Sequence, residues 1–193
     1  MNEDTGRAGT AEADLVAEAM AAAGSAFADE CRACAGRVRL THAILAARER
    51  WAAEQDGLSW SHLDAWEKAR ADVAEALTIN VGRAQSFLGF SLDLVLRLPA
   101  VLEAMEAGRM DERVARDFCR RMATVGADRI AAVQARAVAE YLDRLDRGER
   151  PGRAGVDALI DEIIEQLDAE ALARRRAEAV RDRTVRISPA PDG

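Results

Sequence analysis

The stretch that decides the fold is ADVAEALTINVGRAQSFLGFSLDLVLRLPAVLEAMEAGR, residues 71–109. It contains three helical segments together with the residues that start and stop them. Asn80 can cap the middle segment, because its side-chain oxygen can accept a hydrogen bond from an N–H group of the first turn. Pro99 ends that segment and suits the first turn of the next one, which ends at Gly108. Apolar residues at helical spacing continue on both sides, so we expect an all-α fold, an orthogonal or bundle-like array of about eight helices.

Toward the N-terminus, we expect residues 1–9 to form a disordered tail, because they are small and polar and show no periodicity. One helical domain is then expected over residues 10–183. Its first helix is expected to kink or end at Gly24 and Ser25. A second helix follows and stops at Asp56, where an Asp-Gly pair interrupts the apolar pattern.

Toward the C-terminus, GERPGRAG at residues 148–155 predicts a flexible linker within the helical domain. An amphipathic helix follows it, and Asp168 can cap a last helix. In the tail, residues 184–193, the alternation of Val185 and Ile187 predicts a short strand. The tail ends in Asp-Gly, a hairpin signal that no return strand follows. We therefore expect the chain to be truncated before a further module.

Charge is abundant and unevenly distributed. The chain carries 27 basic and 34 acidic residues, a formal net charge of −7, whereas uniform attraction to nucleic acid requires the opposite sign. Residues 156–170 hold six acids and no base, and residues 171–193 hold six arginines. Asp157, Asp161 and Glu165 form one stripe, which we expect to be solvated because buried unpaired carboxylates are costly. Such faces can dock on each other or on a second copy.

The sequence favours a cytoplasmic location without a membrane partner. The first ten residues lack the basic and apolar regions of a signal peptide. The most apolar stretch, residues 87–102, is too short and too interrupted by Asp93, Arg97 and Pro99 to span a bilayer. Three cysteines do not make a disulfide framework, which agrees with a reducing compartment.

No group of residues predicts catalysis, a metal site or a cofactor. Cys31 and Cys34 have the spacing of a zinc knuckle or a redox motif, but a structural zinc site needs four ligands. The remaining candidates, Cys119 and His42, are not at a telling spacing. A redox motif needs a strand before its helix, whereas this pair lies in a helical pattern. His62 is isolated in the sequence, so we interpret both histidines as helix-surface residues.

Residues 73–88, VAEALTINVGRAQSFL, have the pattern of a helix-turn-helix. Small and apolar residues fall where two crossing helices pack together: Ala74, Leu77, Ile79, Ala84 and Phe87. Arg83, Gln85 and Ser86 are then free to meet DNA in the major groove. Any helical hairpin inside a bundle shows the same pattern, so a DNA-reading hairpin and a purely structural one both remain open.

Several short segments follow one another along the chain in a particular order and spacing. They are the helix at residues 73–77, Arg83-Ala84, Leu98-Pro99, Ala107-Gly108, the helix beginning at Asp168, Val185 and Asp192-Gly193. Through these segments, over about residues 40–193, the chain resembles domain of unknown function 222, which is found in the actinobacterial 13E12-repeat family. Two positions and one region depart from the family pattern. The region is the linker around Gly155, which lacks the usual Thr and Leu-Arg pattern. Thr78 stands where the family tends to have glycine, and Phe90 stands where a small residue is commoner.

The resemblance implies a helical module that often precedes an HNH-type nuclease module, in which histidines and an asparagine hold and use a divalent metal. Nothing after Asp182 resembles such a metal loop, so no catalytic role can be assigned to a residue of this chain. We therefore expect a non-catalytic module that targets DNA through residues 73–88. The alternative is an assembly module, in which the acidic residues 156–170 pair with the basic residues 171–186 of another copy.

Overall fold

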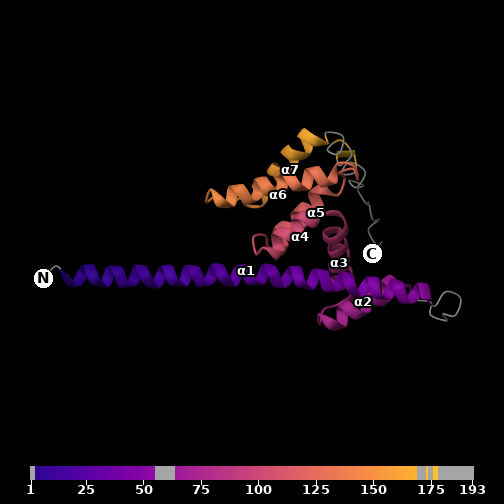
Figure 1. Ribbon diagram of the computed structural model, residues 1–193, viewed down its shortest axis with the longest axis horizontal. Coiled ribbons are helices and arrows are strands. Elements are labelled where there is room, and N and C mark those ends of the chain that lie inside the picture. The colour runs from indigo at the N-terminus through magenta and orange to yellow at the C-terminus, as the bar shows by residue number, and fades with distance from the viewer. Residues whose placement is uncertain (1–2, 55–63, 169–172, 174–175, 178–193) are drawn as a thin grey trace, which may run out of the picture. The chain divides into compact units, whose positions relative to one another are not determined.

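The computed structural model describes residues 3–54, 64–168, 173, 176 and 177. All secondary structure in these residues is helical, which confirms the all-α prediction (Figure 1). The chain forms two compact units, residues 1–116 and 117–193, a division that nothing in the sequence pattern indicated. The elements are α1 (Glu3–Glu54), α2 (Ala65–Ala76), α3 (Val81–Leu92), the π-helical turn η1 (Asp93–Arg97), α4 (Pro99–Glu106), α5 (Glu112–Met122), α6 (Ile130–Asp146) and α7 (Arg153–Leu167).

The helix α1 is continuous over 52 residues. The break expected at Gly24 and Ser25 is therefore wrong. A glycine inside a helix costs only about 1 kcal/mol relative to alanine, and the alanines on both sides offset that cost because alanine has the best helix propensity. The helix begins at Glu3.

The core of the first unit lies between the second half of α1 and the helices α2, α3 and α4, which all pack against it. Apolar residues on α1 that recur every three or four positions are buried there: Cys31, Cys34, Val38 and Leu45. Leu45 joins a cluster whose other buried members come from α2 and α3: Ala69, Val73, Ala84 and Leu88. Small alanines in this cluster let the three helices approach closely. By contrast, Leu15, Met20 and Phe27 in the first half of α1 are exposed.

The segment from Asn80 to Leu98 was expected to be a single α-helix. Instead α3 ends at Leu92 and continues as η1, in which the N–H of Leu98 donates to the carbonyl of Asp93 at 2.8 Å. Pro99 explains the change, because proline disfavours the α conformation in the residue before it. Leu98 accordingly has φ −125° and ψ 51°. Pro99 itself begins α4, as its fixed φ angle predicts.

Gly108 ends the α4 segment, as predicted, and does so in a conformation that needs glycine. Its φ is +74°, in the left-handed region. A β-carbon at this position would also lie 2.9 Å from the β-carbon of Ala28 on α1. Three residues later Asp111 caps α5, because its Oδ1 accepts a hydrogen bond from the N–H of Val114 at 2.7 Å.

In the second unit, α6 and α7 pack against each other. Their buried faces are apolar: Val133, Ala137, Val138 and Tyr141 face inward from α6, and Val156, Ile160, Ile163 and Ile164 from α7. Residues 148–155, expected as a linker, connect these helices, although α7 already begins at Arg153. Most of the predicted last helix and the whole strand-like tail, residues 184–193, lie outside the described residues, so the truncation also stays a prediction.

Candidate nucleic-acid interface

The turn between α2 and α3 fixes how the two helices cross. The N–H of Ile79 donates to the carbonyl of Ala74 at 3.0 Å, which closes the end of α2. Thr78 has φ 52°, the left-handed conformation that glycine adopts most easily. Leu77 and Ile79 turn inward from the corner and pack against the core cluster around Val73.

The start of α3 is set by Asn80, whose Oδ1 accepts a hydrogen bond from the N–H of Arg83 at 2.9 Å. Along α3, Ala84 and Phe87 are buried. Arg83, Gln85 and Ser86 are exposed, on the face that the sequence pattern assigned to them. The side-chain oxygen of Gln85 accepts a hydrogen bond from Nη1 of Arg70 on α2 at 3.2 Å, so its amide is oriented by the neighbouring helix.

Beside this face lies a cavity of about 310 Å³. Three arginines line it, Arg37 from α1, Arg83 from α3 and Arg116 from α5, together with one carboxylate, Glu112. The remaining wall is apolar and is formed by Leu77, Ile79 and Phe87. The cavity thus carries an excess of positive charge next to the exposed face of α3. Sequence reasoning found Arg83 but not Arg37 or Arg116, because these come from helices distant in the chain.

Glu112 and Arg116 hold each other in place at one side of the cavity. Nε of Arg116 donates to Oε1 of Glu112 at 2.9 Å, and the Arg116 guanidinium lies 4.2 Å from the centre of the Phe90 ring. Such stacking on an aromatic face is favourable for a guanidinium. The ring of Phe90 therefore supports one of the cavity arginines.

The other carboxylate oxygen of Glu112 accepts a hydrogen bond from a cysteine. Sγ of Cys34 donates to Oε2 of Glu112 at 3.3 Å. Burial, followed by the negative charge of Glu112, raises the pKa of the Cys34 thiol to about 11. Burial also raises the pKa of Cys31. Both groups are therefore neutral thiols near pH 7 rather than reactive thiolates.

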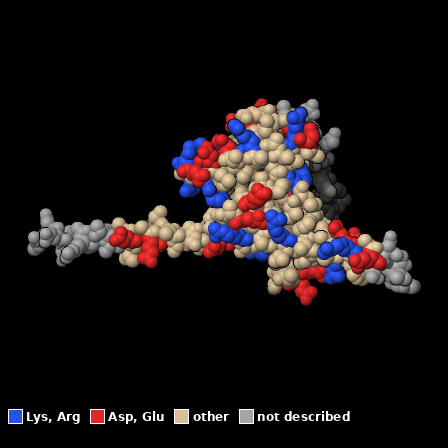
Figure 2. Space-filling view, viewed as in Figure 1, with Lys and Arg blue, Asp and Glu red and all other residues tan. Residues whose placement is uncertain are grey.

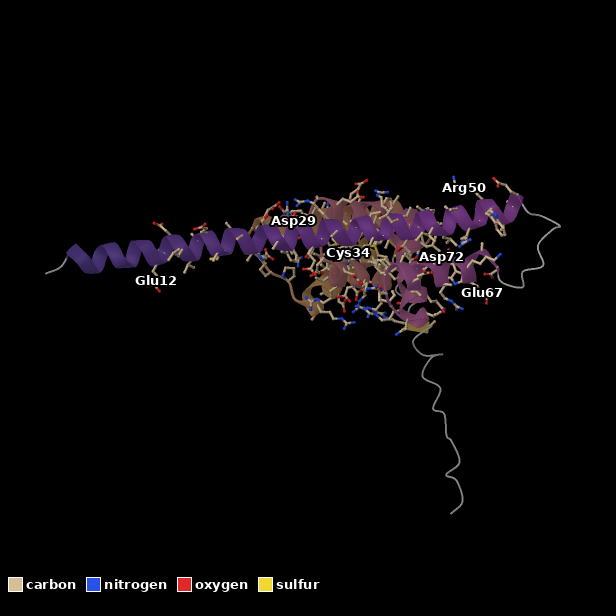
Figure 3. The ribbon with its side chains drawn as sticks, turned by 90° about the horizontal axis from the view of Figure 1, so that it is seen from below. Glu12, Asp29, Cys34, Arg50, Glu67 and Asp72 are labelled. Atoms are coloured by element: carbon tan, nitrogen blue, oxygen red, sulfur yellow. The ribbon has the colours of Figure 1, made fainter. Side chains whose placement is uncertain are left out.

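Other arginines of the first unit are neutralised by ion pairs. Arg48 on α1 donates to both carboxylate oxygens of Asp72 on α2, at 2.6 and 2.7 Å. Figure 3 labels Asp72 and, on α1, Cys34. Arg39 pairs in the same two-pronged way with Glu106 on α4. Hydrogen bonds from these arginines lower the pKa of Asp72 and of Glu106. In the described part of the chain, no carboxylate forms an ion pair with Arg37 or Arg83.

The acidic stripe of α7 was expected to be solvated, and for two of its members this is wrong. Asp157 accepts hydrogen bonds from Nη2 of Arg120 at 2.7 Å and from Nη2 of Arg121 at 2.6 Å. Asp161 accepts from Nη1 of Arg121 at 3.1 Å. The arginines lie on the last turns of α5, and their charges make partial burial of the carboxylates favourable. Glu165 is exposed, as expected.

The remaining residues that the sequence offered as metal or catalytic candidates do not lie together in one site. His42 is half-buried on α1, and His62 lies outside the described residues. Among the residues that the structure describes, no three histidine, cysteine or carboxylate side chains come together as metal ligands. Acidic and basic side chains are intermingled over the face shown in Figure 2.

The structure thus defines an all-α protein in which a helical hairpin packs on a long helix, with an arginine-lined cavity at the start of its second helix. The chain belongs to the family described as domain of unknown function (DUF222), whose family model matches residues 7–193. No curated protein and no solved structure matches it. None of the described helices has both the length and the apolar character to cross a membrane.

Proposed function

We propose that the chain is a non-catalytic helical module that targets DNA, with α3 as the helix that enters the major groove. The observation that carries the proposal is the hairpin itself. A left-handed turn at Thr78 and an amide cap at Asn80 begin α3, and Arg83, Gln85 and Ser86 are exposed in its first half. A helix-turn-helix reads bases with the N-terminal part of its second helix, where these residues lie.

The three side chains suit base recognition. Arginine donates two parallel hydrogen bonds to guanine, and glutamine pairs in the same way with adenine. Serine hydrogen-bonds to bases or to phosphates. Arg70 holds the amide of Gln85 through one hydrogen bond, so less side-chain entropy is lost on binding than for a free glutamine.

Catalysis belongs, in this proposal, to a partner module. The chain acts beside an HNH-type nuclease, as the family resemblance implies, and does not itself cut DNA. Supercoiled plasmid incubated with the protein and Mg²⁺, Mn²⁺ or Zn²⁺ is expected to stay intact. Nicking that disappears in a His42→Ala variant would contradict it.

The direct test is fluorescence anisotropy of labelled DNA duplexes at several salt concentrations, with Arg83→Ala as the test variant. One good base contact is worth about 1–3 kcal/mol, so a loss of about tenfold in affinity is expected. The matched control is Arg136→Ala, an equally exposed arginine on α6. Circular dichroism checks that both variants fold. Equal affinities for the two folded variants would remove α3 from the interface.

The alternative, assembly through complementary acidic and basic helices, is less favoured by the contacts of α7. Asp157 and Asp161 already pair with arginines of the same chain. Fewer carboxylates are then free for a second copy. Sedimentation at rising salt tests this alternative, which requires a dimer that dissociates as its ion pairs are screened.

A further inference from the structure

The three cavity arginines are an electrostatic anomaly, because like charges that share a cavity repel each other. Arg37, Arg83 and Arg116 carry three positive charges against the single negative charge of Glu112. They come from three different helices, so the gathering is not the stripe of one amphipathic helix. A persistent excess of about two charges in one cavity favours binding of an anion.

The three arginines differ in whether they already form an ion pair within the chain. Arg116 is held by Glu112 and by the ring of Phe90, so its position is fixed and its charge is matched by that carboxylate. Arg37 and Arg83 are exposed at the cavity and form no ion pair with a described carboxylate, and Arg37 interacts instead with the thiol of Cys34. Two guanidinium groups can therefore turn toward an incoming ligand without first breaking a salt bridge.

The apolar wall strengthens this attraction. Leu77, Ile79 and Phe87 line the cavity and exclude water from part of it. Charges act on each other more strongly where low-dielectric groups replace water. Glu112 offsets the charge of Arg116 alone, because Arg116 and the Cys34 thiol engage both of its oxygens, and the charges of Arg37 and Arg83 stay unbalanced.

We propose that this cavity binds a phosphate group, held by Arg37 and Arg83 and bordered by the Arg116–Glu112 pair. Guanidinium groups match phosphate geometry with paired hydrogen bonds. A phosphate can carry two negative charges and so balance the excess, whereas a carboxylate carries one. The phosphate belongs either to a nucleic-acid backbone or to a free phosphate compound. Only the first source rests on the proposed function, since the cavity adjoins the face of α3 assigned to DNA.

The first arm of the experiment measures pyrophosphate binding to the full chain by isothermal titration calorimetry. Arg37→Ala and Arg83→Ala are each expected to weaken binding by about tenfold, the usual order for one charge-assisted contact. The controls are Arg50→Ala on α1 and Arg113→Ala on α5, two exposed arginines that do not line the cavity. They are expected to bind like the unaltered chain. Arg83→Lys keeps the charge but loses the paired hydrogen-bond geometry. Its affinity for pyrophosphate is therefore expected to lie between that of Arg83→Ala and that of the unaltered chain.

The second arm repeats the series with a labelled DNA duplex and asks whether pyrophosphate displaces it. Displacement, with a shallower salt dependence for Arg37→Ala, supports a backbone phosphate. Pyrophosphate binding without DNA binding supports the cavity with a free phosphate compound as its ligand, and refutes the proposed function. DNA binding without pyrophosphate binding, with Arg37→Ala behaving like Arg50→Ala, keeps the proposed function and overturns the cavity. If the unaltered chain binds neither pyrophosphate nor the DNA duplex, both proposals are refuted.

Discussion

Replacing Asp157 by asparagine tests the ion-pair network that joins α5 to α7. Asp157 lies between two arginines, and its side chain is only 17% exposed. The hydrogen bond from Arg121, followed by that from Arg120, lowers its pKa from 3.8 to about 2. A difference of about two pKa units corresponds to about 2 kcal/mol of folding free energy near pH 7. Asp157→Asn is expected to lower the free energy of unfolding by about that amount.

The loss depends on pH with a definite sign. A carboxyl whose pKa is depressed in the folded state stabilises the fold at all pH values above its unfolded pKa. That contribution disappears as the pH falls from about 4 to about 2, through the folded pKa of Asp157. Urea unfolding followed by circular dichroism at neutral pH and at pH values down to about 2 is the assay. The unaltered chain and the variant should differ most at neutral pH and converge in acid.

The control is Asp128→Asn. Asp128 has a 78% exposed side chain and contacts only the adjacent Arg129, at 3.3 Å, among the ion pairs of the described chain. Exposed pairs of this kind contribute about 0–1 kcal/mol, so little change is expected. Equal effects of the two substitutions, or an effect of Asp157→Asn that persists unchanged in acid, would refute the assignment of a depressed pKa to this network.

Other predictions concern the backbone and the thiols. Thr78→Gly should raise the free energy of unfolding by about 0.5–1 kcal/mol in urea titrations, because φ 52° strains a β-branched residue; a loss would show that the threonine side chain contributes more than the strain costs. Gly108→Ala should lower the melting temperature much more than Gly148→Ala, since both have positive φ but only the first adds a β-carbon 2.9 Å from Ala28; equal shifts would exclude the clash. Cys34 should resist a thiol-specific disulfide reagent at pH 8 until urea is added, because its pKa is about 11 and it is buried; rapid reaction in the folded chain would contradict that burial.

The features that the sequence predicts well are those with local causes. Asn80, Pro99 and Gly108 act within one helical turn of their own positions, through a cap, a missing N–H and a left-handed φ. The structure places all three where those rules put them. The continuity of α1 was missed for the opposite reason. Gly24 by itself predicts a break in the helix. The stability of a helix, however, depends on the sum over many residues, including the alanines around Gly24.

In the candidate site, too, the features with local causes could be predicted from the sequence and those that depend on packing could not. The exposed face of α3 follows from the alternation of small, apolar and polar residues in one short segment, so Arg83 could be named from the sequence. Arg37 and Arg116 could not, because the cavity exists only once three helices have packed together. The pairing of Asp157 with Arg121 was missed in the same way. A carboxylate stripe at helical spacing looks solvated until a neighbouring helix supplies its counter-charges.

The net charge of −7 is a weak argument against phosphate binding, because electrostatic reach is short. At physiological ionic strength the screening length is about 8 Å, so a ligand responds to the charges beside it rather than to the sum over the chain. In the first unit, Asp72 and Glu106 are each matched by an arginine of a neighbouring helix. Such pairs cancel locally and present little field to an incoming anion. What remains at the cavity is the charge of Arg37 and Arg83, which no described carboxylate balances. An acidic protein can therefore hold a phosphate at one point while its remaining surface repels the rest of a polyanion, and binding then depends on the fit at that point.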